Sequence, residues 1–166
     1  MAQLEARVEA EDDDLESILL LRLPQLKKAL VALQWDLRTF GVEFHIPLYI
    51  EYQDAYKLIG GDRMLNISCI QLWCMYMDTV AVESGKGSIY GFLERQIIQP
   101  SGNTLDSGKK YMQTWMTESN REMYMTPYIE AGHWQLVVII PNKTQVVWFC
   151  SLHRKMKADL KSLIQT

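Results

Sequence analysis

The clearest pattern of apolar residues lies between residues 19 and 40. Large apolar side chains recur there at alternating steps of four and three, which places them on one stripe of an α-helix. The stripe consists of Leu19, Leu23, Leu26, Leu30, Leu33, Leu37 and Phe40. Because proline is tolerated only in the first turn of a helix, Pro24 predicts one helix from residue 24 or 25 to Gly41. This stripe packs on its own domain in the simplest interpretation; a coiled coil through which the chain self-associates is the alternative.

The next part of the chain alternates between extended and helical patterns. Residues 43–61 predict an extended stretch around Pro47, followed by a short helix that ends at a pair of glycines. Residues 66–84 have apolar side chains at helical spacing, and Asn66 or Ser68 is suited to cap the first turn. The sequence therefore predicts a longer helix here, with one buried face.

A glycine-, serine- and asparagine-rich stretch follows over residues 84–108. It predicts a long, irregular connection around a short helix or strand near "IYGFLERQII". The helical pattern then returns over residues 104–122. One side of that helix carries Tyr111, Met112, Trp115 and Met116.

From residue 122 onward the pattern is that of strands. "EMYMTPYI" is one strand, in which Pro127 indicates an edge or an irregular point. "HWQLVVII" and "QVVWFC" flank "PNKT", which has the length of a hairpin loop. Both arms are apolar at nearly every residue, so the hairpin is predicted to be central in a sheet and covered on both faces. "HRKMKADLKSLIQT" predicts a terminal helix with no further chain to pack against.

The hairpin register places one residue beside His133. If "PNKT" is the loop, Ile140 faces Gln145, position 133 lies opposite 152, and position 150 is the diagonal neighbour at about 7 to 8 Å. A carboxylate at that position would fix the tautomer of the imidazole, as the third member of a catalytic triad does. Cys150 stands there instead. A histidine at a strand end is more often structural than catalytic, so spacing alone predicts an α+β domain and no more.

Composition narrows the class of protein. With 166 residues, 48% of them hydrophobic, the chain can bury the core of one domain. A net charge of −3 without a block of Lys or Arg argues against binding nucleic acid. The acidic residues 9–14 are expected to be solvated. We expect no cofactor and no metal, because "SGKGS" lacks the spacing of a phosphate loop and the cysteines lack paired C-x-x-C spacing.

The three cysteines, Cys69, Cys74 and Cys150, are odd in number, and each is expected to be a small structural residue. The N-terminus has no signal-peptide pattern, and no apolar run approaches the ~18 residues of a membrane span. The sequence therefore predicts an intracellular protein of the nucleus or cytoplasm that has no membrane segment.

A resemblance adds to this reading. The run "YMTPYIEAGHWQLVVIIPNKTQVVWFCSL" closely resembles the segment that carries the catalytic His and Asp in the SUMO-specific (sentrin-type) cysteine proteases. "LNISCIQLWCMYM" resembles an upstream helix of that family, and "HWQLVVI…VVWFCSLHRK" is most similar to its plant, transposon-encoded branch. The likeness covers about residues 45–160. It implies an α+β, papain-like or adenovirus-proteinase-like fold that is truncated to N-terminal helices and part of the central antiparallel sheet.

The resemblance also implies domains and roles. Residues 1–41 would be an acidic segment and amphipathic helix, and 42–166 a partial ubiquitin-like-protease catalytic domain. His133 matches the general base, Trp134 matches the aromatic residue that covers the narrow C-terminal tail of the substrate, and Cys150 falls on the Asp of the family. A thiol cannot stabilise an imidazolium as a buried carboxylate does. The oxyanion-stabilising Gln and the "G-x-D-C-G"-like motif of the nucleophile do not occur in these 166 residues.

Two functions are therefore expected. The first is a fragment of a cysteine-type peptidase that acts on conjugates or precursors of SUMO or another ubiquitin-like protein, without turnover in the chain as given. The alternative is a non-catalytic, protease-like binding remnant of a transposon-encoded protein. In both, the partner is a ubiquitin-like protein.

Overall fold

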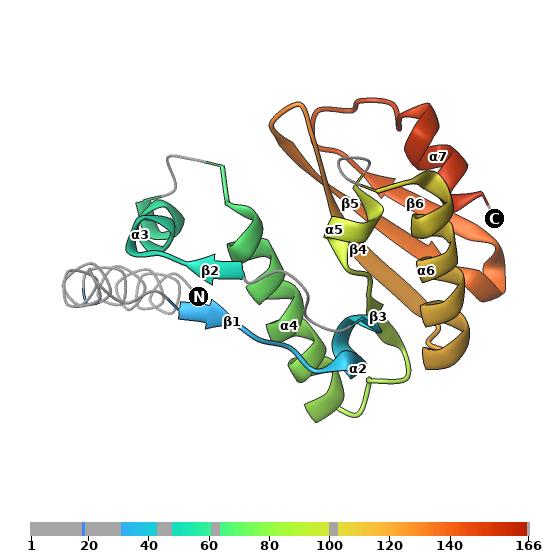
Figure 1. The fold of residues 1–166 in the computed structure, drawn as a ribbon, viewed down its shortest axis with the longest axis horizontal. Coiled ribbons are helices and arrows are strands. Elements are labelled where there is room, and N and C mark those ends of the chain that lie inside the picture. Colours follow the sequence, from blue (N-terminus) through green and yellow to red (C-terminus); the bar gives the residue numbers. More distant parts are fainter. Residues whose placement is uncertain (1–17, 19–30, 43–47, 61–63, 100–102, 166) are drawn as a thin grey trace, which may run out of the picture. The chain divides into compact units, whose positions relative to one another are not determined.

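The computed structural model describes residues 18, 31–42, 48–60, 64–99 and 103–165. Helices and strands are mixed along them, which confirms the α+β class (Figure 1). The chain divides into two compact units, the first made of Met1–Gln34 and Ile46–Gln71, the second of Trp35–His45 and Leu72–Thr166. This division differs from the predicted boundary at residue 41, because each unit takes segments from both sides of it.

The first unit contains a small antiparallel pair of strands. β1 (Val31–Leu33) pairs with β2 (Leu48–Ile50), and α3 (Tyr52–Gly60) follows directly. The extended stretch and the short helix ending at Gly60 are therefore confirmed. The first residues of α4 (Ile67–Glu83) also belong here, and Asn66 Oδ1 accepts a hydrogen bond from the Cys69 backbone N–H at 3.2 Å, so the predicted cap is confirmed.

The single helix predicted from residue 24 to Gly41 is wrong over its described part. Val31–Leu33 is a strand, and the helix α2 (Leu37–Phe40) is only one turn long. Asp36 starts α2 by accepting a hydrogen bond from the Arg38 backbone N–H, and Gly41 ends it with φ +69°. Pairing with β2 and a strong cap override the apolar period. Residues 19–30 lie outside the described residues, so self-association through the stripe stays a prediction.

The second unit is built on a four-stranded sheet in the order β3-β4-β5-β6. Its strands are β3 (Tyr90–Phe92), β4 (Met123–Glu130), β5 (His133–Ile140) and β6 (Gln145–Phe149). β3 runs parallel to β4, and the other neighbours are antiparallel. Ile140 pairs with Gln145, so the predicted hairpin register is confirmed. Pro127 lies beyond Met125, where pairing with β3 ends, as an irregular point should.

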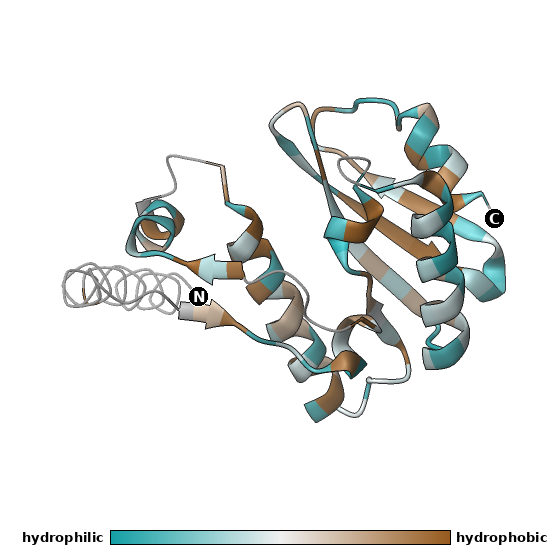
Figure 2. Ribbon diagram, in the orientation of Figure 1, coloured by the Kyte–Doolittle hydropathy of each residue, from teal (hydrophilic) through white to brown (hydrophobic). Residues whose placement is uncertain are grey.

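One face of this sheet is covered by α5 (Arg95–Ile98), α6 (Leu105–Ser119) and α7 (Ala158–Ile164) (Figure 1). Figure 2 shows apolar colour along the middle of the sheet and both polar and apolar colour on α7. The core on this face consists of Leu93, Ile98, Met112, Trp115, Tyr124, Tyr128, Val137, Ile139, Leu160 and Leu163. The predicted apolar side of α6 is confirmed. The prediction that the terminal helix has nothing to pack against is wrong, because Leu160 and Leu163 are buried in this core.

A second, smaller core gathers residues of α2, α4 and β3. Its buried members are Phe40, Cys74 and Phe92. Partly buried side chains around them are Trp35, Val42, Met75, Met77 and Met125. Because Met125 alternates with Tyr124 along β4, the two cores lie on opposite faces of the sheet.

The prediction that the whole hairpin is central and covered on both faces is wrong for β6. In the part of the chain that the structure describes, β6 pairs only with β5, and Val146 and Phe149 are 38% and 55% exposed. β5 does have the predicted burial at Val137, Val138 and Ile139. An apolar sequence indicates burial poorly when the strand has no neighbour on its outer side.

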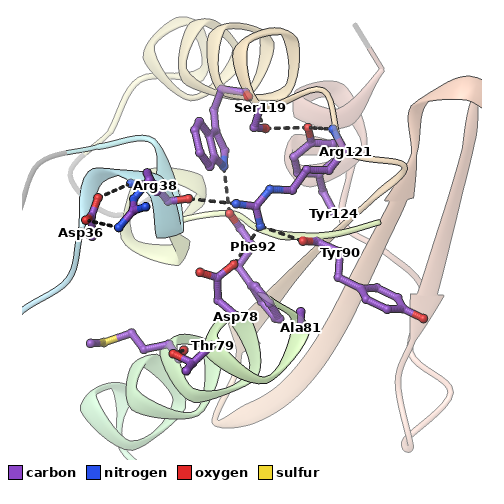
Figure 3. Close-up of polar contacts among 12 residues, drawn as sticks. Asp36, Arg38, Asp78, Thr79, Ala81, Tyr90, Phe92, Ser119, Arg121 and Tyr124 are labelled. Atoms are coloured by element: carbon purple, nitrogen blue, oxygen red, sulfur yellow. Dashed lines mark hydrogen bonds and ion pairs between the residues drawn. The ribbon is translucent and has the colours of Figure 1, made fainter. Parts of the chain in front are cut away.

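Arg121, just before β4, joins four elements of the second unit (Figure 3). Its Nη1 donates to Asp78 Oδ1 at 2.8 Å and to the Tyr90 carbonyl oxygen at 2.7 Å. Its Nη2 donates to the Arg38 carbonyl oxygen at 3.0 Å, and the guanidinium lies over the Trp115 ring. α2, α4, β3 and α6 are thereby connected through one side chain.

Replacing this residue by Arg121→Met should lower the free energy of unfolding by about 3 kcal/mol, because Asp78, whose side chain is 11% exposed, would lose its counter-charge. Urea denaturation monitored by tryptophan fluorescence measures the loss. Arg38→Met is the matched control, because it breaks an ion pair with Asp36 on the surface and should change stability little. Equal losses for the two variants would contradict the central role of Arg121.

A second stability prediction compares two glycines with positive φ. A Cβ on Gly41 would overlap the Trp115 ring, whereas a Cβ on Gly85 would have no neighbour within 4 Å. Gly85→Ala should cost roughly 1 kcal/mol from the left-handed backbone alone. Gly41→Ala should cost about 2 kcal/mol more, because the packed ring must move. The same denaturation experiment tests this order. A smaller loss of stability for Gly41→Ala than for Gly85→Ala would contradict it.

Candidate functional site

A tight turn between β4 and β5 places His133. Ala131 and Gly132 form the two-residue loop and have φ of +47° and +70°, and positive φ at both positions is the requirement of a type I′ hairpin turn. Glu130 and His133 are paired directly across the turn. His133 is therefore the first residue of β5, and it is half-buried at the mouth of the hairpin. A two-residue loop that contains glycine between two apolar runs, as in "EAGH", is typical of this turn.

The structure brings Ser151 to His133. Ser151 Oγ lies 3.4 Å from His133 Nε2, and Ser151 is exposed to solvent. A base and a hydroxyl in this arrangement resemble a nucleophile with its activating imidazole, at a distance longer than the usual 2.6 to 3.2 Å. Such contacts are often longer without substrate. The spacing along the predicted hairpin did not place Ser151 against the ring.

Cys150 does not occupy the position that the ladder predicted. Pairing of β5 with β6 stops at Leu136 and Phe149, and the chain then turns. The His153 backbone N–H donates to the Cys150 carbonyl oxygen at 3.0 Å, and His153 has φ +51°. Cys150 Sγ accepts a hydrogen bond from the Arg154 backbone N–H at 3.4 Å. The predicted pairing of 133 with 152 is therefore wrong, because the ladder ends before it.

The carboxylate opposite His133 is engaged elsewhere. Glu130 Oε1 lies 2.6 Å from Lys157 Nζ, just before α7. Among the described residues, no carboxylate is hydrogen-bonded to the His133 ring. The site thus offers an imidazole and a hydroxyl without the group that would orient the ring for catalysis.

Trp134 lies on the opposite face of β5 from His133, since strand residues alternate. The Arg95 guanidinium carbon is 5.2 Å from the centre of the Trp134 ring, which is a cation–π contact. Arg95 is 4% exposed, and burial lowers the pKa of its guanidinium. Its Nε and Nη1 have no hydrogen-bond partner among the residues that the structure describes. This contact holds the Trp134 ring in place. Arg95 was not among the predicted site residues, although a charge inside the apolar run "GFLERQII" was its signal.

The helix cysteines are not activated nucleophiles. Burial, with a smaller contribution from Glu94, raises the pKa of the Cys74 thiol to about 12. Burial also raises the pKa of Cys69, and the charge of Asp54 raises it further. A reactive cysteine needs a lowered pKa, so both have the properties of structural residues.

Searches found no protein-family model that matches the chain and no curated protein that matches it. The described residues contain no group of three His, Cys, Asp or Glu side chains that could hold a metal ion. None of the described helices is long and apolar enough to cross a membrane.

The thiols give a prediction of reactivity. At pH 8, iodoacetamide should modify half-buried Cys150 rapidly and Cys69 slowly, because Cys69 is protonated. Buried Cys74, with a pKa of about 12, should react only after denaturation. Peptide mass mapping over time measures each rate. Cys150→Ser should abolish the rapid phase and Cys74→Ser should leave it unchanged; a rapid phase that survives Cys150→Ser would show that this assignment is wrong.

Proposed function

We propose that the chain is the base-bearing part of a cysteine peptidase of the SUMO-protease type, with a partial papain-like fold. In this proposal His133 is the residue that acts as general base in such peptidases, and Trp134 covers the C-terminal tail of a ubiquitin-like protein. The observation that carries the proposal is the place of His133 at the start of β5, with its Nε2 toward the exposed Ser151 Oγ. A nuclear or cytoplasmic location is part of the same proposal.

The fixed aromatic residue supports a substrate-binding role. Trp134 follows the base directly in sequence, and its ring is held by the cation–π contact with Arg95. A ring that is already fixed loses little conformational entropy when an extended peptide lies against it. The neighbouring positions on β5 thus combine a proton acceptor and a rigid apolar surface.

Turnover by these 166 residues is not expected. Glu130 pairs with Lys157, and no other carboxylate of the described residues is bonded to the imidazole. The Cys74 thiol is protonated at neutral pH, and among the described residues the side chain placed against His133 Nε2 is the hydroxyl of Ser151 and not a thiol. Chemistry of this class requires a thiolate formed beside the base. The same observations favour the second candidate, a non-catalytic binding module of protease-like fold.

The test pairs a cleavage assay with a binding assay. We expect no release of fluorophore from SUMO carrying a C-terminal fluorogenic amide. We expect labelled SUMO with a mature C-terminal tail to bind, and Trp134→Ala to weaken the affinity at least about tenfold, which corresponds to ~1.4 kcal/mol. Tyr76→Ala is the control, because Tyr76 is an exposed aromatic residue on α4 and should leave binding unchanged. Ubiquitin serves as the comparison ligand.

The outcomes separate the alternatives. Cleavage that is lost in His133→Ala would overturn the expectation of an inactive chain. Cleavage that is lost in Ser151→Ala but survives in Cys150→Ser would point to the hydroxyl as nucleophile and contradict a thiol peptidase. Absence of binding to both SUMO and ubiquitin would remove the support for either proposed function.

A further inference from the structure

A hollow of about 1090 Å³ lies in the second unit, between α6, α7 and one face of the β5–β6 hairpin. Ile139, Val146 and Trp148 share this face of the sheet, because Ile139 pairs with Val146 and the face alternates along each strand. Further apolar lining comes from Met112, Met116, Met156 and Ile164. Unbranched methionines fit many ligand shapes, so this lining suits a peptide of variable side chains. We name this hollow the α6–α7 groove.

The charged side chains that line the groove have one sign. They are Arg154, Lys155 and Lys161, all of them exposed, and no Asp or Glu is among the described lining residues. Within the described part of the chain, none of the three is in an ion pair. The whole chain has a net charge of −3, so the sign of this positive cluster is opposite to that of the net charge. The groove therefore favours an acidic ligand.

The floor of the groove continues into a free strand edge. Of the described strands only β5 pairs with β6, and "QVVWF" contains neither a charge nor a proline that would block a further strand. Edge strands with these properties accept an extended peptide through backbone hydrogen bonds. A chain bound here could place apolar side chains into the groove.

We propose that the α6–α7 groove docks an acidic peptide segment, with interspersed apolar residues, of another protein. A peptide explains both the apolar floor and the basic rim, whereas a nucleic acid would use the charges and leave the floor empty, with Trp148 as the single aromatic among the described lining residues. The groove begins about six residues along β5 from His133, or roughly 20 Å, so the inference does not rest on the function proposed for that residue.

The experiment uses the full chain and a fluorescein-labelled synthetic peptide of 16 alternating Glu and Leu residues. Fluorescence anisotropy should show saturable binding that weakens as the salt concentration rises. The double variant Lys155→Glu with Lys161→Glu should raise the dissociation constant at least about tenfold. The matched control, Lys86→Glu with Lys110→Glu, makes the same charge change at described positions that do not line the groove, and should alter it less than about twofold.

Further probes identify the ligand class. A peptide of alternating Glu and Ser should bind at least about tenfold more weakly, because it lacks the apolar side chains. The proposal is overturned if single-stranded DNA of 16 nucleotides binds more tightly than the Glu-Leu peptide, if the two double variants behave alike, or if the wild-type chain shows no saturable binding. Sedimentation that reveals a dimer lost in the Lys155 and Lys161 variant would assign the groove to a second copy instead, and would also overturn it.

Discussion

The second unit depends on the hydrogen bonds that the Arg121 guanidinium donates to three partners. β3 has three residues and α2 has four, and elements of this length have little stability alone. Arg121 binds the carbonyl oxygens of Arg38 and Tyr90 and the carboxylate of Asp78, so both short elements are attached to α4. Because Arg121 lies two residues before β4, the same contact brings β3 to the strand with which it pairs. The small core around Phe40, Cys74 and Phe92 forms between the elements connected in this way.

The antiparallel strands β4, β5 and β6 have a different role, because they determine where the candidate functional site lies. The tight turn at Ala131 and Gly132 starts β5 with His133, and the early end of pairing at Phe149 lets the following chain turn back. That turn, and not the ladder, carries Ser151 to the imidazole. The site therefore depends on where strand pairing stops. If pairing ended one residue earlier or later, a neighbouring side chain would take the place of the Ser151 hydroxyl.

Sequence patterns predicted the parts of this fold that depend on local chemistry. Asn66 as a cap, the register of Ile140 with Gln145 and the apolar side of α6 are all confirmed. The prediction of one helix over residues 24–41 was wrong, because Val31–Leu33 pairs with β2. A periodic pattern in the sequence cannot reveal such a partner strand. The burial of α7 and the exposure of β6 depend on tertiary neighbours in the same way. Ser151 was missed because a strand end was extrapolated, and Arg95 because its partner Trp134 is distant in sequence.

The ion pair between Glu130 and Lys157 connects the end of β4 to the start of α7. Glu130 stands directly opposite His133, at a position from which a carboxylate could pair with an imidazolium. Lys157, immediately before α7, occupies that carboxylate while the helix is anchored by Leu160 and Leu163. The packing of the last helix thus keeps Lys157 beside this carboxylate. The partner of a carboxylate at the mouth of the hairpin is therefore determined by a hydrophobic contact in the layer of helices that covers the sheet.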